Sequence, residues 1–365
     1  MIMEIGKSAR FRQNNVKFNP KCHSINQNPK LFNLFFRIMS QLNTKSSASK
    51  EPVFFIGSIP IFGKAFLAPM DGLSDSPLRQ VSRRFGSALS ISEFVNAFNF
   101  VNGHPHRENQ IPFDPIERPF AYQIFDNDIS RITTTAQYLM KYQPDFIDIN
   151  MGCSNRAVSN RGAGAGLMRE PQKVASLIST LVKEIPVPIT AKIRLGWDEN
   201  ELNYLEIAKI LEDTGCACIT LHARTRVQQY SGIADWDAIA QLVQHVSVPV
   251  IGNGDVLHYL QIDEMIAYTQ CKAVMIGRGA IGNPWIFNHQ DREQIPLRDR
   301  LWVMLDHLAR MTAYYGADRA PVLFRKFIKH YLKDADLPAS FYQKAFCFDS
   351  SDKLAQFLQD ILQDQ

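Results

Sequence analysis

A single cysteine stands where an apolar run opens into a glycine-rich loop. The segment Asn150–Cys153 closes the run 146–149, and the glycine-rich stretch 161–166 follows it. Glycines let the backbone approach a ligand without a Cβ in the way, so a cysteine there can expose its sulfur to that ligand. The alternative is a small packed residue, because free cysteine usually behaves as a buried hydrophobe. The loop makes Cys153 the first candidate for chemistry.

Two other turns have the composition of a phosphate site. Gly252–Asp255 and Gly277–Gly279 each follow an apolar, β-branched run. Backbone N–H groups in such turns can point at an anion, and Arg278 adds a positive charge. Either turn alone would be explained by a tight bend. The two together, near the end of an alternating β/α pattern, favour a phosphorylated cofactor.

A lysine, a glutamine and a histidine are candidates for holding the ring of that cofactor. A lysine at the mouth of a barrel either forms a Schiff base or holds an anionic ring. The second use fits Lys192 better, because the amide of Gln123 can both donate to and accept from the edge of a flavin pyrimidine ring. His222 is either a further contact or a core histidine with satisfied hydrogen bonds, and both interpretations stay open.

These residues share one expected place, the carboxyl ends of parallel strands. Apolar runs predict strands at 66–69, 88–93, 121–125, 146–150, 189–194, 218–222, 248–252 and 273–277. Amphipathic stretches predict helices at 77–85, 129–142, 171–184, 202–213, 236–245 and 257–268. This alternation predicts an α/β fold, a (β/α)8 TIM barrel, in preference to a doubly wound sheet, because polar and glycine-rich turns recur after successive strands. Segment 54–62 is expected to form a small hairpin that caps the other end of the barrel.

Only helical patterns follow the barrel. Apolar residues at helical spacing predict helices through 301–311, 323–332 and 354–361. We therefore expect a barrel over residues 51–290 and a small all-helical C-terminal domain over residues 291–365. Arg325, Lys329 and Lys333 recur at intervals of four and would form one basic helix face. Such a face is either solvated surface or a contact with an anionic partner.

Residues 1–50 differ in composition from the rest of the chain. They hold nine Lys and Arg against one Glu, and they are expected to be a poorly ordered basic extension. Three interpretations compete: a translation start placed too early, with Met39 as the true start, a basic arm that contacts nucleic acid, and an organelle presequence. We favour the first. Residues 51–365 hold 31 Lys and Arg against 35 Asp and Glu, so the body of the protein is not basic.

Composition excludes several classes of protein. Hydrophobic residues at 45% and charged residues at 21% are ordinary for a globular protein. The six cysteines include no CxxC pair and no Cys/His cluster at zinc spacing, which argues against a bound metal or a disulfide framework. No apolar run approaches the ~18 residues of a membrane span. We expect a monomeric cytoplasmic protein.

Six motifs, taken in order, resemble the FMN-dependent tRNA-dihydrouridine synthase family, and especially its bacterial B-type branch. The motifs are Ala68–Gly72, Asn150–Cys153, Lys192–Trp197, His222–Arg226, Asn253–Asp255 and Met275–Ala280. The resemblance covers about residues 53–345 and includes the junction Asn283–Phe287. One such motif would be weak, whereas six in order are specific.

The resemblance implies an enzyme in which NADPH reduces FMN and the flavin passes hydride to C6 of a tRNA uridine, while Cys153 delivers a proton to C5. The implied cofactor contacts are Pro69, Met70, Asp71, Gln123, Lys192, His222, Asn253, Gly254, Asp255, Gly277 and Arg278. The implied contacts with the tRNA substrate are Asn150, Arg194 and Arg224 at the mouth, and Arg325, Lys329 and Lys333 in a tRNA-binding helical domain. Donors near the uracil carbonyl oxygens suit this chemistry, because reduction of the C5–C6 bond develops enolate character.

One departure from the family pattern concerns the residues after the cysteine. The family usually has proline there, followed by a basic cluster, whereas this chain has Ser154 and keeps only Arg156 of the cluster. Serine removes the backbone restraint of proline and leaves the loop less restricted. A tRNA-binding protein that has lost catalysis is therefore an alternative. A second is an FMN barrel oxidoreductase acting on a small pyrimidine, although the basic helical tail speaks against it.

Overall fold

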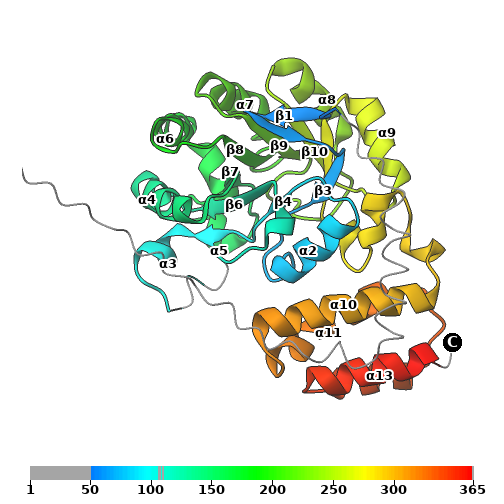
Figure 1. Ribbon diagram of the computed structural model, residues 1–365. Helices are drawn as coiled ribbons and strands as arrows, with labels where there is room; N and C mark the ends of the chain where they lie inside the picture. The colour runs from blue at the N-terminus through cyan, green and yellow to red at the C-terminus, as the bar shows by residue number, and fades with distance from the viewer. Residues whose placement is uncertain (1–50, 106–107, 109–110, 364–365) are drawn as a thin grey trace, which may run out of the picture. The chain divides into compact units, whose positions relative to one another are not determined.

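The computed structural model describes residues 51–105, 108 and 111–363. The extension predicted over residues 1–50 lies outside these residues. The barrel strands and the C-terminal helices that follow them belong to one compact unit. Figure 1 shows the strands enclosed by helices, with the last four helices of the chain coloured from orange to red.

Parallel strands form a nearly closed barrel with eight strand positions. In chain order the strands are β3 (Ala65–Leu67), β4 (Ser90–Ile91), β5 (Val95–Asn96), β6 (Phe120–Phe125), β7 (Phe146–Met151), β8 (Ile189–Arg194), β9 (Cys218–His222), β10 (Val250–Asn253) and β11 (Ala273–Ile276). Both β4 and β5 pair with β6, so they share one position. The last strand, β11, pairs with β3, and the Ala88 N–H donates to the Ala65 carbonyl across the remaining seam at 2.9 Å. The predicted TIM barrel is confirmed.

Helices return the chain from each strand end to the start of the next strand. The main barrel helices are α2 (Ser76–Arg84), α4 (Ile129–Leu139), α6 (Pro171–Glu184), α7 (Tyr204–Asp213), α8 (Trp236–His245) and α9 (Leu260–Thr269). Side-chain caps define several starts, since Asp128 accepts from the Arg131 N–H and Asp235 from the Ala238 N–H. The prediction missed the short elements β5, α3 (Ala97–Val101) and α5 (Arg156–Ser159), which are too short to show a hydrophobic period.

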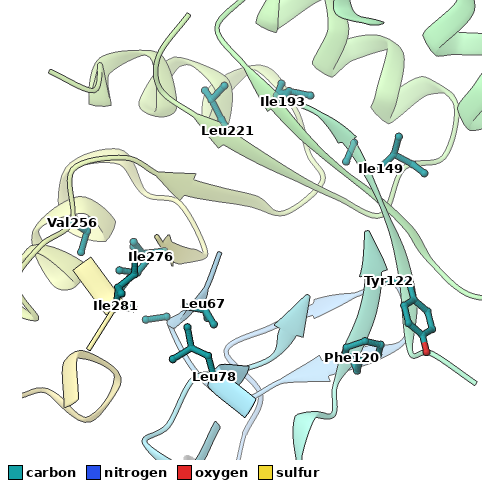
Figure 2. Close-up of a cluster of buried hydrophobic side chains, with 14 of the residues drawn as sticks. Leu67, Leu78, Phe120, Tyr122, Ile149, Ile193, Leu221, Val256, Ile276 and Ile281 are labelled. Carbon is teal, nitrogen blue, oxygen red and sulfur yellow. The ribbon is translucent and has the colours of Figure 1, made fainter. Parts of the chain in front are cut away.

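Alternating strand residues build two separate hydrophobic layers. Tyr122, Ile149 and Leu221 point outward into the large cluster between strands and helices, as Figure 2 shows. The interior holds a second cluster, to which the hairpin of β1 (Phe54–Ile56) and β2 (Ile59–Ile61) contributes three side chains. The hairpin contacts the start of β8, where a Cβ on Gly57, at φ +57°, would lie 2.6 Å from Pro188 Cγ. The predicted hairpin cap is confirmed.

The C-terminal region is helical throughout its described part. It comprises α10 (Leu297–Tyr315), α11 (Arg319–Tyr331), α12 (Ala339–Cys347) and α13 (Ser351–Gln363), of which the sequence had not indicated α12. Polar contacts join α10 to barrel helix α2: Arg84 Nη1 lies 2.8 Å from Asp306 Oδ1, and Tyr315 donates to Asp75 Oδ2 at 2.9 Å. The domain boundary at 290/291 stays a prediction.

Within the described ranges, no helix has both the length and the apolar character that a membrane span needs.

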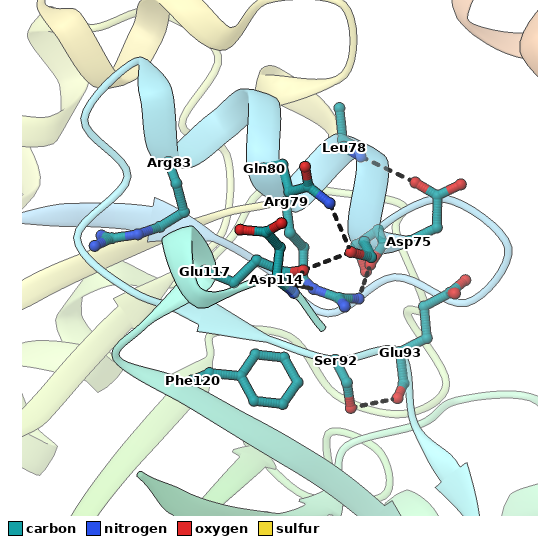
Figure 3. A network of polar contacts seen from close by, with 12 residues as sticks. Asp75, Leu78, Arg79, Gln80, Arg83, Ser92, Glu93, Asp114, Glu117 and Phe120 are labelled. Carbon is teal, nitrogen blue, oxygen red and sulfur yellow. Dashed lines mark hydrogen bonds and ion pairs between the residues drawn. The ribbon is translucent and has the colours of Figure 1, made fainter. Parts of the chain in front are cut away.

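A buried ion pair fixes helix α2 against the barrel. Arg79 Nε lies 2.5 Å from Glu117 Oε2, and the two side chains are 3% and 0% exposed. Glu117 also accepts from Ser76 Oγ at 2.5 Å, while Arg79 Nη1 donates to the Ser74 carbonyl at 2.8 Å (Figure 3). The network therefore ties together α2, the turn that precedes it and the turn before β6. Because α2 follows the loop after β3, the same network holds one wall of the barrel mouth.

Candidate active site

One cavity of about 1040 Å³ opens at the carboxyl ends of the barrel strands. It brings together every residue that the family resemblance assigned to the barrel mouth, together with Cys153. These are Pro69, Met70, Asp71, Gln123, Asn150, Cys153, Lys192, Arg194, His222, Arg224, Asn253, Gly254, Asp255, Gly277 and Arg278. The volume is slightly above the ~300–1,000 Å³ typical of ligand sites, so a cofactor and part of a substrate can share it.

The turn that carries Cys153 is held from both sides. Asn150 Oδ1 accepts from the N–H groups of Gly152 at 3.1 Å and Cys153 at 2.9 Å. On the other side lies Gly164, at φ +55°, where a Cβ would stand 2.7 Å from Cys153 Cβ. This backbone favours glycine, and a Cβ at that distance would clash with the cysteine, so glycine leaves the room that Cys153 needs. The glycine-rich stretch thus packs directly against the reactive candidate.

The Cys153 thiol is protonated at neutral pH. Burial raises its pKa above the ordinary value, and Asp71 acts in the same direction; a backbone N–H and the arginines Arg194 and Arg161 oppose them only in part. A thiol in this state holds a proton that it can donate, rather than acting as a thiolate nucleophile. The side chain is half-buried and lines the cavity, so the proton is accessible to a ligand.

A lysine and a neutral histidine line the cavity between strands β8 and β10. Lys192 Nζ donates to Asn253 Oδ1 at 3.0 Å, and Asn253 Nδ2 donates to the Met275 carbonyl at 2.8 Å. Burial, followed by repulsion from Arg194, lowers the pKa of Lys192 to about 7. Burial has the largest effect on His222 and holds its pKa well below the ordinary value. The neighbouring cations act in the same direction, and Lys192 has the largest effect among them. His222 can therefore donate and accept hydrogen bonds as a neutral ring.

Two arginines, Arg224 and Arg278, line the cavity beside the Gly254 turn. Arg224 Nη2 donates to both oxygens of Asp255 at 2.6 Å, and Arg278 Nη2 lies 3.7 Å from Asp255 Oδ1. Burial alone would raise the pKa of Asp255, but the hydrogen bonds from Arg224 and the Ala234 N–H bring it below its ordinary value. A carboxylate repels a phosphate, so the contribution of Asp255 is to orient the two arginines.

A buried donor at this end fits an anionic group. Arg224 Nη1 is buried, and within the described part of the chain it has no hydrogen-bond partner. It lies 3.8 Å from where a Cβ would stand on Gly254, whose φ is +137°. A phosphate at the Gly254 turn would give this N–H an acceptor, which satisfies the general requirement that buried polar groups be paired. The sequence had assigned Arg224 to the substrate; its position here suits a cofactor phosphate better.

Arg194 connects two loops of the mouth. Its Nε donates to the Gly152 carbonyl at 2.7 Å, and its Nη1 donates to the carbonyls of Thr225 and Gln229 at 2.8 and 2.9 Å. A weaker contact of 3.4 Å joins Nη2 to Ser154 Oγ. Because a guanidinium has five N–H donors, these contacts leave little of Arg194 for a ligand. It chiefly holds the Cys153 turn in place.

Sequence reasoning missed an aromatic side chain at the mouth. Tyr230 lies in the loop after β9, is 58% exposed, and lines the cavity. The guanidinium carbons of Arg278 and Arg194 lie 5.0 and 5.8 Å from its ring centre. The loop shows no periodicity or motif that would have identified this residue.

The three basic residues of the tail lie outside the cavity and differ from one another. Arg325 donates through Nη2 to the Phe348 carbonyl at 3.1 Å, so it stabilises the helical region itself. Lys329 is exposed, with its Nζ 5.5 Å from the ring centre of Phe346. Lys333 is also exposed, but it follows the end of α11 at Tyr331. Lys333 therefore lies in the turn after the helix, although it still lines the same surface pocket as Lys329. The common basic face stays a prediction.

No group of three or more His, Cys, Asp and Glu side chains in the described ranges could hold a metal ion.

Comparisons with known proteins agree with the motifs. The family model for dihydrouridine synthase matches residues 66–365. The chain is 33% identical over 299 residues to tRNA-dihydrouridine synthase B of Pasteurella multocida, covering 80% of this chain and 90% of that protein. It is 35% identical over 294 residues to tRNA-dihydrouridine synthase B of Pseudomonas aeruginosa, covering 78% and 88%. The probable tRNA-dihydrouridine synthase of Rhizobium leguminosarum is 36% identical over 271 residues, covering 74% and 85%. The predicted resemblance is confirmed.

Proposed function

Because this chain belongs to the dihydrouridine synthase family, we propose that it reduces specific uridines of tRNA to 5,6-dihydrouridine, with FMN as cofactor and NADPH as reductant. The observation that carries the proposal is the cavity itself. It combines a protonated thiol on one side with a glycine-rich, arginine-lined end that has an unpaired buried donor. The first suits proton donation and the second suits a cofactor phosphate.

The residues divide between the two ends of FMN. Gly254, Gly277, Arg224 and Arg278 would hold the phosphate, with Asp255 orienting the arginines. The remaining mouth residues would surround the ring: Pro69, Met70, Asp71, Gln123, Lys192, His222 and Asn253. When bound, reduced FMN supplies the hydride that uridine C6 accepts. A cationic Lys192 beside the ring would stabilise its reduced, anionic form.

Cys153 supplies the proton in this proposal. As hydride arrives at C6, the C5–C6 double bond becomes a single bond, and the electron pair at C5 takes the thiol proton. The resulting thiolate returns to the thiol by taking a proton from solvent. Asn150 retains one Nδ2 hydrogen beyond its bond to Gln123, and that hydrogen can face a uracil carbonyl oxygen in the cavity.

The tRNA must present its uridine as an unstacked base to enter the mouth. Lys329 and Lys333 are exposed cations on the helical region and are the proposed phosphate contacts, while Arg325 donates to the Phe348 carbonyl within that region. The monomeric state and cytoplasmic location expected from the sequence stay predictions.

Turnover with defined substrates tests the proposal. Purified protein reconstituted with FMN should be yellow, oxidise NADPH, and form dihydrouridine in an unmodified tRNA transcript, as measured by nucleoside mass spectrometry. Reoxidation of the reduced flavin by free uracil but not by tRNA would identify a small-pyrimidine oxidoreductase. Binding of tRNA without dihydrouridine formation would identify a protein that has lost catalysis.

A further inference from the structure

A carboxylate lies below the active site, inside the barrel, where the proposed mechanism makes no use of it. Asp148 on β7 is 1% exposed, and its side chain accepts from Gln123 Nε2 at 2.7 Å and from Thr190 Oγ1 at 2.6 Å. An unpaired carboxylate is costly to bury, so this position needs a physical reason. Its neighbours supply one, because both connect to residues of the site.

The carboxylate determines the direction of two amide side chains. An amide can be turned end for end without changing its shape, so its hydrogen-bond partners decide its orientation. Burial raises the pKa of Asp148, while the hydrogen bonds from Gln123 and Thr190 and the charge of Lys192 favour its ionised form. The ionised carboxylate can only accept, which turns the NH₂ end of Gln123 toward it and the Oε1 end toward Asn150 Nδ2, at 2.8 Å. Asn150 must then direct Oδ1 at the Cys153 turn, where it accepts the two backbone N–H groups.

Asp148 also provides a negative charge to Lys192. The two residues lie on neighbouring strands, and the Asp148 charge raises the pKa of Lys192 against burial. The other ionisable groups that act on Lys192 are Arg194 and Cys153, and Lys192 in turn acts on His222. The charge of Asp148 also raises the pKa of the buried thiols of Cys216 and Cys218, after burial itself. Of the three groups that act on Lys192, which are Arg194, Cys153 and Asp148, only Asp148 is a carboxylate.

We propose that Asp148 is a positioning residue of this active site, which orients Gln123, Asn150 and the Cys153 turn and places a carboxylate on the strand next to that of Lys192. The expected effect of Asp148 on turnover rests on the proposed function. Its expected effect on the titration of Lys192 does not. Two substitutions separate the two actions. Asp148→Asn removes the charge but can still accept from Gln123 through Oδ1, with its NH₂ group facing Thr190. Asp148→Leu has similar size and removes the acceptor as well.

The first test needs neither FMN nor substrate. Competitive labelling of the cofactor-free protein with acetic anhydride, read by peptide mass spectrometry, measures the pH at which Lys192 becomes reactive. The wild-type midpoint should lie near 7, and Asp148→Asn should lower it by about one pH unit. Thr190→Val, which removes only the second donor, and Cys218→Ala, which alters a buried neighbour, should leave the midpoint unchanged.

The second test uses the loaded enzyme. Asp148→Leu should slow tRNA-dependent flavin reoxidation by about 10–100-fold at every pH, because Gln123 then no longer fixes the orientation of Asn150, whose Oδ1 is the acceptor for the Cys153 turn. In the pH profile of this rate, Asp148→Asn should approach the wild-type rate at acid pH. As the pH rises, its rate should fall at a lower pH than the wild-type rate does. An unchanged Lys192 midpoint in Asp148→Asn, or an Asp148→Leu rate equal to that of Thr190→Val, overturns the proposal. If Asp148→Leu does not fold, the labelling of Asp148→Asn alone decides it.

The two proposals fail in different ways. A wild-type protein that forms no dihydrouridine, while Asp148→Asn still lowers the Lys192 midpoint, would overturn the proposed function and support the coupling of Asp148 to Lys192. A wild-type protein that does form dihydrouridine, with an unchanged midpoint in Asp148→Asn, would overturn only the role of Asp148.

Discussion

Replacing Cys153 with alanine separates the two half-reactions of the proposed enzyme. Reduction of the flavin by NADPH requires no proton at uracil C5, whereas reduction of uridine does. Cys153→Ala should therefore leave FMN binding and flavin reduction intact but slow tRNA-dependent reoxidation by about 10²–10⁴-fold, the usual contribution of a positioned general acid. Because the side chain is half-buried and faces the cavity, its removal should have little effect on stability.

The assay is anaerobic stopped-flow mixing of reduced enzyme with unmodified tRNA, followed by flavin absorbance. The pH dependence adds a second criterion. The pKa of the Cys153 thiol is raised by burial, so the acid form persists to higher pH than in an ordinary cysteine. The step that uses the thiol should therefore not slow through loss of its proton between pH 6 and about 8.5, the ordinary thiol pKa. Reoxidation of Cys153→Ala at the wild-type rate would refute the assignment of the acid.

Two companion variants sharpen this test. Cys271→Ala removes a buried thiol outside the cavity and should retain the wild-type rate. Ser154→Pro restores the residue typical of the family; it removes only the 3.4 Å contact of Ser154 Oγ with Arg194, so activity should be equal or higher. A large loss in Ser154→Pro would show that this loop needs its serine.

Other variants test the cofactor end, the tRNA contacts and the fold. Arg278→Ala should weaken FMN binding by about 1.5 kcal/mol, roughly tenfold in a fluorescence titration, because a half-exposed charge-assisted contact is lost; unchanged affinity would exclude Arg278 from the phosphate site. Lys329→Ala with Lys333→Ala should reduce the log–log salt slope of tRNA binding by up to about 0.7–0.9 for each contact, without changing NADPH oxidation. An unchanged slope would make these lysines solvated surface. Glu117→Gln should lower the free energy of unfolding by about 3–5 kcal/mol in urea titrations, since it leaves Arg79 buried without its counter-charge; a loss below 1 kcal/mol would mean that the pair does not hold α2.

The salt-slope experiment has a matched control. Lys209 and Lys353 are exposed lysines on α7 and α13, each paired with a nearby acidic residue. Their double alanine variant changes the net charge by the same amount, so it should leave the slope near the wild-type value if the effect is local. Arg325 is kept in both proteins because its bond to the Phe348 carbonyl gives it a structural role.

The residues at the strand ends were predictable, because long apolar runs and the polar turns after them are local signals. The cavity accordingly contains each of the predicted mouth residues, from Pro69 to Arg278. Asp148 was not predicted as part of the site. In the sequence it is only a polar residue within an apolar run, and its partners Gln123 and Thr190 lie 25 and 42 residues away on other strands.

The tail was less predictable for a related reason. Spacing suggested that Arg325, Lys329 and Lys333 form one face. Spacing does not reveal where a helix ends, or that Arg325 donates to the carbonyl of Phe348, which follows α12. Helix α12 was missed because it buries only Phe341 and Ala345, whereas α2, which has the same length and was predicted, buries six residues.

Nucleoside mass spectrometry of tRNA from cells that lack this protein tests the central claim most directly. At least one tRNA uridine position should lack the two hydrogens of dihydrouridine in those cells, and the wild-type protein should restore them while Cys153→Ala should not. Unchanged dihydrouridine at every position, in cells that have no second enzyme of this family, would contradict the account.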